Sequence, residues 1–204
     1  MKTKIMRQGI AVLLLVLSCL AVGCEDNTKT PGSETQKKTN EFETGRFALQ
    51  KMIPSARLWA ADAQPIELRS YPTSESNGQG GKSANWRVVF GSRGRGKSEP
   101  FTWTGMADAP QKIDHGVEDT FNPNNRSTQA FDLNFLKVDT DKAFTVAQEH
   151  GGKKITDHDP KTEISYLLEW NAQSNELIWH VIYADQSKMT VLVDATTGAY
   201  LRKE

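Results

Sequence analysis

The residue types that most often carry chemistry are few and dispersed in this 204-residue chain. No two of its four histidines have a metal-ligand spacing such as H-x-x-x-H or H-E-x-x-H; they are His115, His150, His158 and His180. Asp157-His158-Asp159 could contribute to a cation site, although a charged loop before Pro160 explains it equally. The sequence has no G-x-S-x-G motif, and both of its cysteines lie at or before residue 24. We therefore predict a protein that is not an enzyme and that holds no metal or cofactor.

A basic loop is the one segment that invites a phosphate-binding interpretation. Gly91–Ser98 carries Arg93, Arg95 and Lys97, and Arg87 lies just before it. The loop lacks the G-x-x-x-x-G-K-[ST] spacing and joins two predicted strands instead of opening a helix. A solvated hairpin tip explains it better than an anion site.

The overall charge excludes one class of partner. Lysine plus arginine and aspartate plus glutamate are equal, at 25 each. The first 23 residues carry three basic residues and no acid, so the remainder has 22 basic and 25 acidic residues. A nucleic-acid-binding protein normally has a basic excess, and we expect no nucleic-acid partner.

The first residues of the chain predict an export signal. Residues 1–23 combine a basic start with an apolar run from Ile10 to Val22, which is short for a membrane span and typical of a signal peptide. Ala21-Val22-Gly23-Cys24 resembles a bacterial lipobox, in which the cysteine is acylated and becomes the first residue of the mature protein. The resemblance implies a lipidated Cys24 and a protein anchored to membrane lipid on the periplasmic side of the cell envelope. A competing match ends at Cys19 but shortens the apolar run, and an ordinary secretory signal with two incidental cysteines is the other alternative.

The elements of the folded part follow from periodicity. Residues 25–41 contain no aliphatic or aromatic side chain and are predicted to be a disordered tether. A helical stripe covers 44–61, with a kink or a restart expected at Pro54. Residues 72–85 and 106–132 are predicted to be irregular, and 141–150 to be a second helix, capped by Asp139 or Thr140 and stopped by Gly151-Gly152. The predicted strands are 66–71, 86–90, 100–104, 164–170, 177–183, 189–193 and 199–201.

An internal repeat relates the two halves of the folded part. Trp86-Arg87-Val88-Val89-Phe90 matches Trp179-His180-Val181-Ile182-Tyr183 at an offset of 93 (179 − 86), and Thr104-Gly105 matches Thr197-Gly198 at the same offset. On each Trp strand the large side chains should share one face, covered by the helix of the same half. We predict an α+β fold made of two tandem units, each with one helix on a small antiparallel meander. The predicted segments are a signal peptide at 1–23, a lipidated cysteine and tether at 24–42, a first unit at 43–105, a connection at 106–138 and a second unit at 139–204.

The second unit also resembles a known family. Val191–Leu201 is similar to the closing signature of the PepSY domain, whose last strand runs into a Val-Asp-x-x-Thr-Gly-x turn. The first unit resembles it only through the repeat and lacks the equivalent of Asp194. PepSY-type domains, whose fold is cystatin-like, occur in the propeptides of thermolysin-like peptidases and in exported lipoproteins. The resemblance implies a module that restrains a protein partner.

Three function classes follow from the sequence. The first is a membrane-tethered protein-binding or regulatory module, for which edge-strand pairing is a natural mode. The second is a purely structural envelope protein, and the third is a small-molecule or lipid carrier. A deep apolar cavity between helix and sheet would favour the carrier. A filled core with one bare strand edge would favour the binding module.

Overall fold

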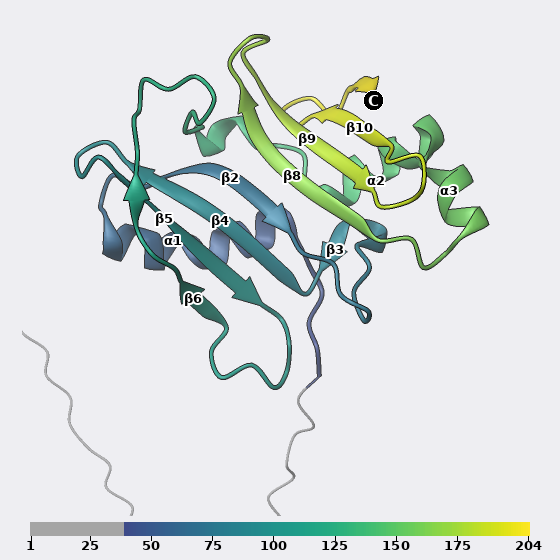
Figure 1. Cartoon of the computed structure of the whole chain (residues 1–204), viewed down its shortest axis with the longest axis horizontal. Coiled ribbons are helices and arrows are strands. Elements are labelled where there is room, and N and C mark those ends of the chain that lie inside the picture. Colours follow the sequence, from purple (N-terminus) through teal and green to yellow (C-terminus); the bar gives the residue numbers. More distant parts are fainter. Residues whose placement is uncertain (1–38) are drawn as a thin grey trace, which may run out of the picture. The chain divides into compact units, whose positions relative to one another are not determined.

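The computed structural model describes residues 39–204, so Cys19, Cys24 and the predicted signal peptide lie outside the described residues. Figure 1 shows the arrangement of the elements. The helices and helical turns are α1 (Gly45–Trp59), η1 (Gln79–Gly81), η2 (Leu133–Phe135), α2 (Thr140–Ala147), the π-helical turn η3 (Gln148–Gly152) and α3 (Lys153–His158). The strands are β1 (Glu43–Thr44), β2 (Gln64–Ser70), β3 (Lys82–Ser83), β4 (Asn85–Ser92), β5 (Lys97–Thr104), β6 (Ile113–His115), β7 (Asp119–Thr120), β8 (Ile164–Asn171), β9 (Glu176–Tyr183), β10 (Thr190–Asp194) and β11 (Tyr200–Lys203). Among these residues no helix has the length and apolar character that crossing a membrane requires.

One antiparallel sheet of nine strands forms the body of the fold. Its order is β11-β10-β9-β8-β2-β4-β5-β6, and β7 also pairs with β5. The two predicted meanders are therefore not separate sheets, because β2 pairs with β8 and places Leu68 opposite Leu168. The predicted α+β class is confirmed: the structure has one main helix and a large antiparallel sheet.

The helices cover one face of the sheet and bury a single core. Trp86, Val88 and Phe90 of β4 share a buried face, as do Trp179, Val181 and Tyr183 of β9. Helix α1 contributes Leu49, Met52 and Ala56 to the same cluster, and α2 contributes Ala143, Val146 and Ala147. In Figure 1, α1 lies behind β2, β4 and β5. The alternation predicted for the two Trp strands is thus confirmed.

The first helix does not restart at Pro54. It runs without interruption from Gly45 to Trp59, although proline removes a backbone donor. Its apolar stripe is buried on both sides of the proline, at Met52 and Ala56. This packing offsets the missing hydrogen bond.

The second helix continues past the predicted stop. Asp139 caps α2 as expected, its carboxylate accepting from the Thr140 backbone N–H at 2.7 Å. Gly151-Gly152 then bends the chain instead of ending it, because Gly151 has a φ of 119° and α3 follows directly. A Cβ on Gly152 would lie 2.0 Å from the Tyr183 hydroxyl oxygen. Asp157 and His158, predicted in a loop, therefore belong to α3.

Two segments predicted to be irregular are docked against the fold. In the segment at 72–85, the Gly78 carbonyl accepts from the Tyr166 hydroxyl at 2.7 Å, and the Gly81 carbonyl accepts from Thr140 Oγ1 at 2.5 Å. In the segment at 106–132, β6 and β7 pair with β5. Both segments are therefore parts of the folded structure, unlike the exposed loop and irregular connection that were predicted.

Two tryptophans meet where the helices begin. Trp86 Nε1 donates to the Glu43 carbonyl oxygen at 3.0 Å, and Trp179 Nε1 donates to the Val138 carbonyl oxygen at 2.8 Å. Each acceptor lies two residues before the first residue of a helix, α1 or α2. A Cβ on Gly45 would lie 2.8 Å from Trp179 Cη2 and 3.0 Å from Trp86 Cζ3, so the start of α1 packs directly on both rings.

Candidate functional site

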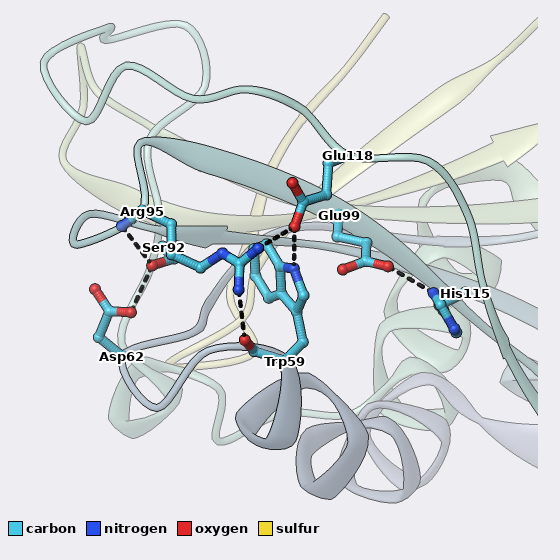
Figure 2. Close-up of polar contacts among 7 residues, drawn as sticks. All are labelled: Trp59, Asp62, Ser92, Arg95, Glu99, His115 and Glu118. Atoms are coloured by element: carbon cyan, nitrogen blue, oxygen red, sulfur yellow. Dashed lines mark hydrogen bonds and ion pairs between the residues drawn. The ribbon is translucent and has the colours of Figure 1, made fainter.

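Polar side chains gather where α1 ends beside the turn between β4 and β5 (Figure 2). Trp59 is the last residue of α1, Arg95 lies in that turn and Glu118 directly precedes β7. Glu118 Oε1 accepts from Trp59 Nε1 at 2.7 Å and also from Arg95 Nη2, while Arg95 Nη1 donates to the Trp59 carbonyl oxygen at 3.1 Å. The Arg95 guanidinium lies over the Trp59 ring, 5.1 Å from its centroid. We call these three residues the Trp59 cluster.

Asp62 stabilises the turn that carries Arg95. Its carboxylate accepts from Ser92 Oγ at 2.6 Å and from the Gly94 backbone N–H at 2.8 Å. Ser92 Oγ in turn accepts from the Arg95 backbone N–H at 3.1 Å. The Ser92 hydroxyl and the Gly94 N–H hold the pKa of Asp62 below its ordinary value, because both stabilise the charged carboxylate.

Glu118 is the acceptor that joins the helix to the turn. Its pKa lies below the ordinary value, chiefly because Trp59 Nε1 donates to it and then because of the nearby positive charge of Arg95. The guanidinium of Arg95 is thus committed to Glu118 and to the helix end. Arg87 alternates with the buried Trp86 and Val88, so it points to the other face of the sheet. The phosphate-binding interpretation of the basic loop gains no support, because Arg95 is paired with Glu118 and Arg87 points to the other face of the sheet.

A buried carboxylate and an exposed imidazole form a second pair beside the cluster. Glu99 of β5 is 4% exposed, and its Oε1 lies 2.6 Å from Nδ1 of His115 on β6. The imidazole also packs beside Phe101, with ring centroids 5.9 Å apart. Figure 2 shows Nδ1 turned toward Glu99. Within residues 39–204 no serine, threonine or cysteine side chain is hydrogen-bonded to His115.

Two aliphatic side chains stand exposed beside the Trp59 cluster. Leu58 is 89% exposed and Val117 is 88% exposed. Each is the chain neighbour of a cluster member, Leu58 of Trp59 and Val117 of Glu118, and these two members are hydrogen-bonded to each other. We call these two exposed residues, each adjacent in the chain to a member of the Trp59 cluster, the aliphatic rim.

The structure does not bring the other histidines to this site. His150 Nδ1 lies 2.8 Å from the Val146 carbonyl oxygen, and its ring stacks on Tyr200 at 3.8 Å. His158 ends α3, and Nε2 of His180 lies 3.4 Å from Glu169 Oε1 on the sheet. Within the described range of 39–204, no group of three or more histidine, cysteine, aspartate and glutamate side chains is placed to hold a metal ion.

Sequence reasoning missed the partners that define this site. Trp59 was expected on the apolar stripe of α1, but nothing in its neighbourhood indicated Glu118, which is 59 positions away. Likewise, no sequence pattern predicted the contact between Glu99 and His115. The available signal was the alternation of Ile113, Asp114 and His115, which is compatible with a short strand beside β5.

Comparison with known proteins finds a similarity of fold. No family model matches the chain, so the PepSY resemblance finds no support there. No curated protein matches it either. A solved structure, described as a candidate lipoprotein from Clostridium difficile 630, is similar with a TM-score of 0.53 and 12% sequence identity, over 82% of this chain and 97% of that chain. At this identity the similarity establishes a shared fold.

Proposed function

We propose that this chain is a bacterial lipoprotein anchored through acyl groups on Cys24, whose folded part is a non-catalytic module that binds a protein partner at the envelope. The anchor rests on the apolar segment before Ala21-Val22-Gly23-Cys24 and on the polar tether that follows. The protein that shares this fold is itself described as a candidate lipoprotein, which supports the same address for this chain.

The observation that carries the binding role is the aliphatic rim around the Trp59 cluster. Single exposed aliphatic residues are common on protein surfaces. Here the two most exposed large apolar side chains of residues 39–204, Leu58 and Val117, adjoin Trp59 and Glu118 in the chain, and Glu118 fixes the positions of Trp59 and Arg95. Tryptophan and arginine are the residues most enriched among those that dominate binding energy. Because their side chains are already ordered, a partner loses less conformational entropy when it binds them.

A side-chain surface suits this fold better than strand addition does. The outer strands β6 and β7 have three and two residues, and β11 at the other edge has four. Such short edges offer an incoming strand few backbone hydrogen bonds. Between the helices and the sheet the core is filled by Trp86, Tyr166 and Trp179, which favours binding at the surface over a carrier cavity beneath the helices.

The tandem description of the fold remains part of this proposal. The strand order divides the sheet where β2 meets β8. Strands β2, β4 and β5 lie in one half, and β8, β9 and β10 lie in the other. The bonds from Trp86 and Trp179 to carbonyls two residues before a helix support an origin from two copies of one unit. Restraint of a peptidase is the specific partner role that the PepSY-like turn at Val191–Leu201 suggests.

The anchor is tested by fractionation and mass spectrometry of the full chain. We expect the wild-type protein and Cys19→Ala to remain in the membrane with acyl groups on the N-terminal cysteine, and Cys24→Ala to be released or unprocessed. Membrane retention of Cys24→Ala with acylation at Cys19 would overturn the assignment.

The binding surface is tested by site-specific crosslinking in the native host. A photoreactive residue at position 58 or 117 should capture the same partner, and Trp59→Ala should abolish both crosslinks. The matched control is position 71, because Tyr71 is another exposed large hydrophobic residue, 44% exposed, outside the Trp59 cluster. Equal capture from position 71, or capture that survives Trp59→Ala, would refute the surface.

A further inference from the structure

A second surface feature lies in the other half of the sheet and is independent of the Trp59 cluster. An open groove of ≈ 1000 Å³ lies between helix α3 and the turn at 184–189, which joins β9 to β10. Figure 1 shows α3 near the end of this hairpin. A groove of this size can accept a ligand as large as a fatty acid. We call it the α3 groove.

The floor of the α3 groove is apolar. It includes Ile155 from α3 and Met189, the residue directly before β10, and both side chains pack with the main core. Gly151 closes one side without a side chain, and a Cβ there would lie 3.4 Å from Met189 Sδ. Methionine adapts its shape to a flexible apolar ligand. The floor therefore suits a hydrocarbon chain.

The rim of the groove has uncommitted positive charge. Lys154 lies on α3, and Lys203 approaches from β11. Within residues 39–204, neither of these two side chains is in an ion pair. The neighbouring Lys153, by contrast, is bound to Asp157 at 2.8 Å.

The acids of the rim are already engaged. Asp159 Oδ1 accepts from the Lys161 backbone N–H at 2.9 Å. Both carboxylate oxygens of Asp185 accept from Ser187 Oγ, at 2.8 and 2.9 Å. These hydrogen bonds leave both carboxylates negatively charged but hold them within their own turns. Lys154 and Lys203 have no ion-pair partner among the described residues, so their side chains can reach an anionic group in the groove.

We propose that the α3 groove binds a single-chain amphiphile with an anionic headgroup, such as a long-chain carboxylate. The hydrocarbon chain lies on Ile155 and Met189, and the headgroup is bound by Lys154 and Lys203. This goes beyond the proposed protein-binding role, because the groove shares no residue with the Trp59 cluster.

Binding is measured by displacement of a fluorescent fatty acid from the full chain carrying Cys24→Ala, so that the protein's own acyl groups do not compete. We expect oleate to displace the probe and oleyl alcohol to do so roughly 5- to 10-fold less well, because the two exposed charge contacts of the headgroup together contribute about 1 kcal/mol. Lys154→Gln with Lys203→Gln should remove the difference between the two ligands. Lys153→Gln, the matched neighbour, should leave the affinity for oleate unchanged.

Four results would overturn the proposal, of which three concern the probe and the lysine variants. They are an absence of probe binding, equal binding of oleate and its alcohol to the wild-type groove, or an equal effect of Lys153→Gln and Lys154→Gln. Displacement by inorganic phosphate alone would also overturn it, because the site would then recognise a free anion and not an amphiphile. Ile155→Asp should abolish binding, but it is interpreted only if its melting temperature matches that of the lysine variants. The crosslinking at position 58 is unaffected by any of these outcomes.

Discussion

Asp139 caps the N-termini of two helices at once. Its Oδ1 accepts from the Thr140 N–H at 2.7 Å, at the start of α2, and from the Arg46 N–H at 2.9 Å, in the first turn of α1. Thr44, the N-cap residue of α1, makes no side-chain capping bond of its own. The first turn of α1 is instead served by Asp139 and by Thr140, whose Oγ1 accepts from the Gly45 N–H at 3.0 Å.

We expect Asp139→Ala to lower the free energy of unfolding by about 2 kcal/mol, because each lost cap costs about 1 kcal/mol. For a folded part of this size, this loss corresponds to a fall in melting temperature of about 4–8 °C. Asp139→Asn keeps an acceptor oxygen and should lose much less. Urea unfolding followed by circular dichroism gives the change directly.

The matched control is Asp132→Ala. Asp132 caps the short turn η2 and accepts from a single backbone N–H, that of Asn134 at 2.8 Å. Its loss should cost about 1 kcal/mol or less. If Asp139→Ala destabilises the protein no more than Asp132→Ala does, the double cap does not operate and the reasoning is refuted.

Three further predictions concern stability. Gly45→Ala should destabilise the protein by about 1–3 kcal/mol, because the added Cβ would collide with Trp86 and Trp179. In a double-mutant cycle, Trp179→Leu should relieve part of that cost. Helix propensity alone predicts the opposite, so a stabilising Gly45→Ala would show that the two rings can move and would refute the prediction. Burial raises the pKa of Tyr183 to about 12, so the stability that its neutral form provides should be present below pH 10 and lost as the pH rises through about 12. Burial raises the pKa of Tyr166 as well, so Tyr183→Phe should reduce the late step of an absorbance titration of tyrosinate without removing it. A wild-type titration complete near pH 10, or a late step that Tyr183→Phe leaves unchanged, would contradict the prediction. The Ser92 hydroxyl and the Gly94 N–H depress the pKa of Asp62, so the stability that its carboxylate provides should be present above pH ~4 and lost as the pH falls through the depressed pKa. In acid unfolding, the stability of Asp62→Asn should therefore depend less on pH in that range than the stability of the wild type, and identical profiles would refute the prediction.

Periodicity predicted the parts of the fold whose signal is local. The stripe of α1 and the alternation of Trp86, Val88 and Phe90 were visible because burial imposes a repeat on each element. The docked segments had no such signal. The pairing of His115 with Phe101, or the bond from Tyr166 to Gly78, depends on residues that are distant in the chain and mostly polar.

The candidate site was the least predictable part for the same reason. Arg95 was visible as a cation in a loop, but its role depends on Trp59 and Glu118, which the fold brings to it from 36 positions before and 23 positions after. At a glycine pair, by contrast, a local signal was present but predicted the wrong structure. Gly151-Gly152 has the composition of a helix stop, yet close packing on the Tyr183 hydroxyl makes it a bend between two helical segments.

The location of both proposed surfaces follows from how the centre of the fold is occupied. At the start of α1 and α2, the indole N–H groups of Trp86 and Trp179 bond to backbone carbonyls, Gly45 packs on both rings, and Asp139 binds backbone N–H groups of both helices. These groups are therefore engaged with one another. Side chains with unused capacity lie instead at the two ends of the sheet, as the exposed aliphatic rim near β6 and as the unpaired cations of the α3 groove near β11. Substitutions at the centre should therefore change stability before they change binding, and substitutions at either end should do the reverse.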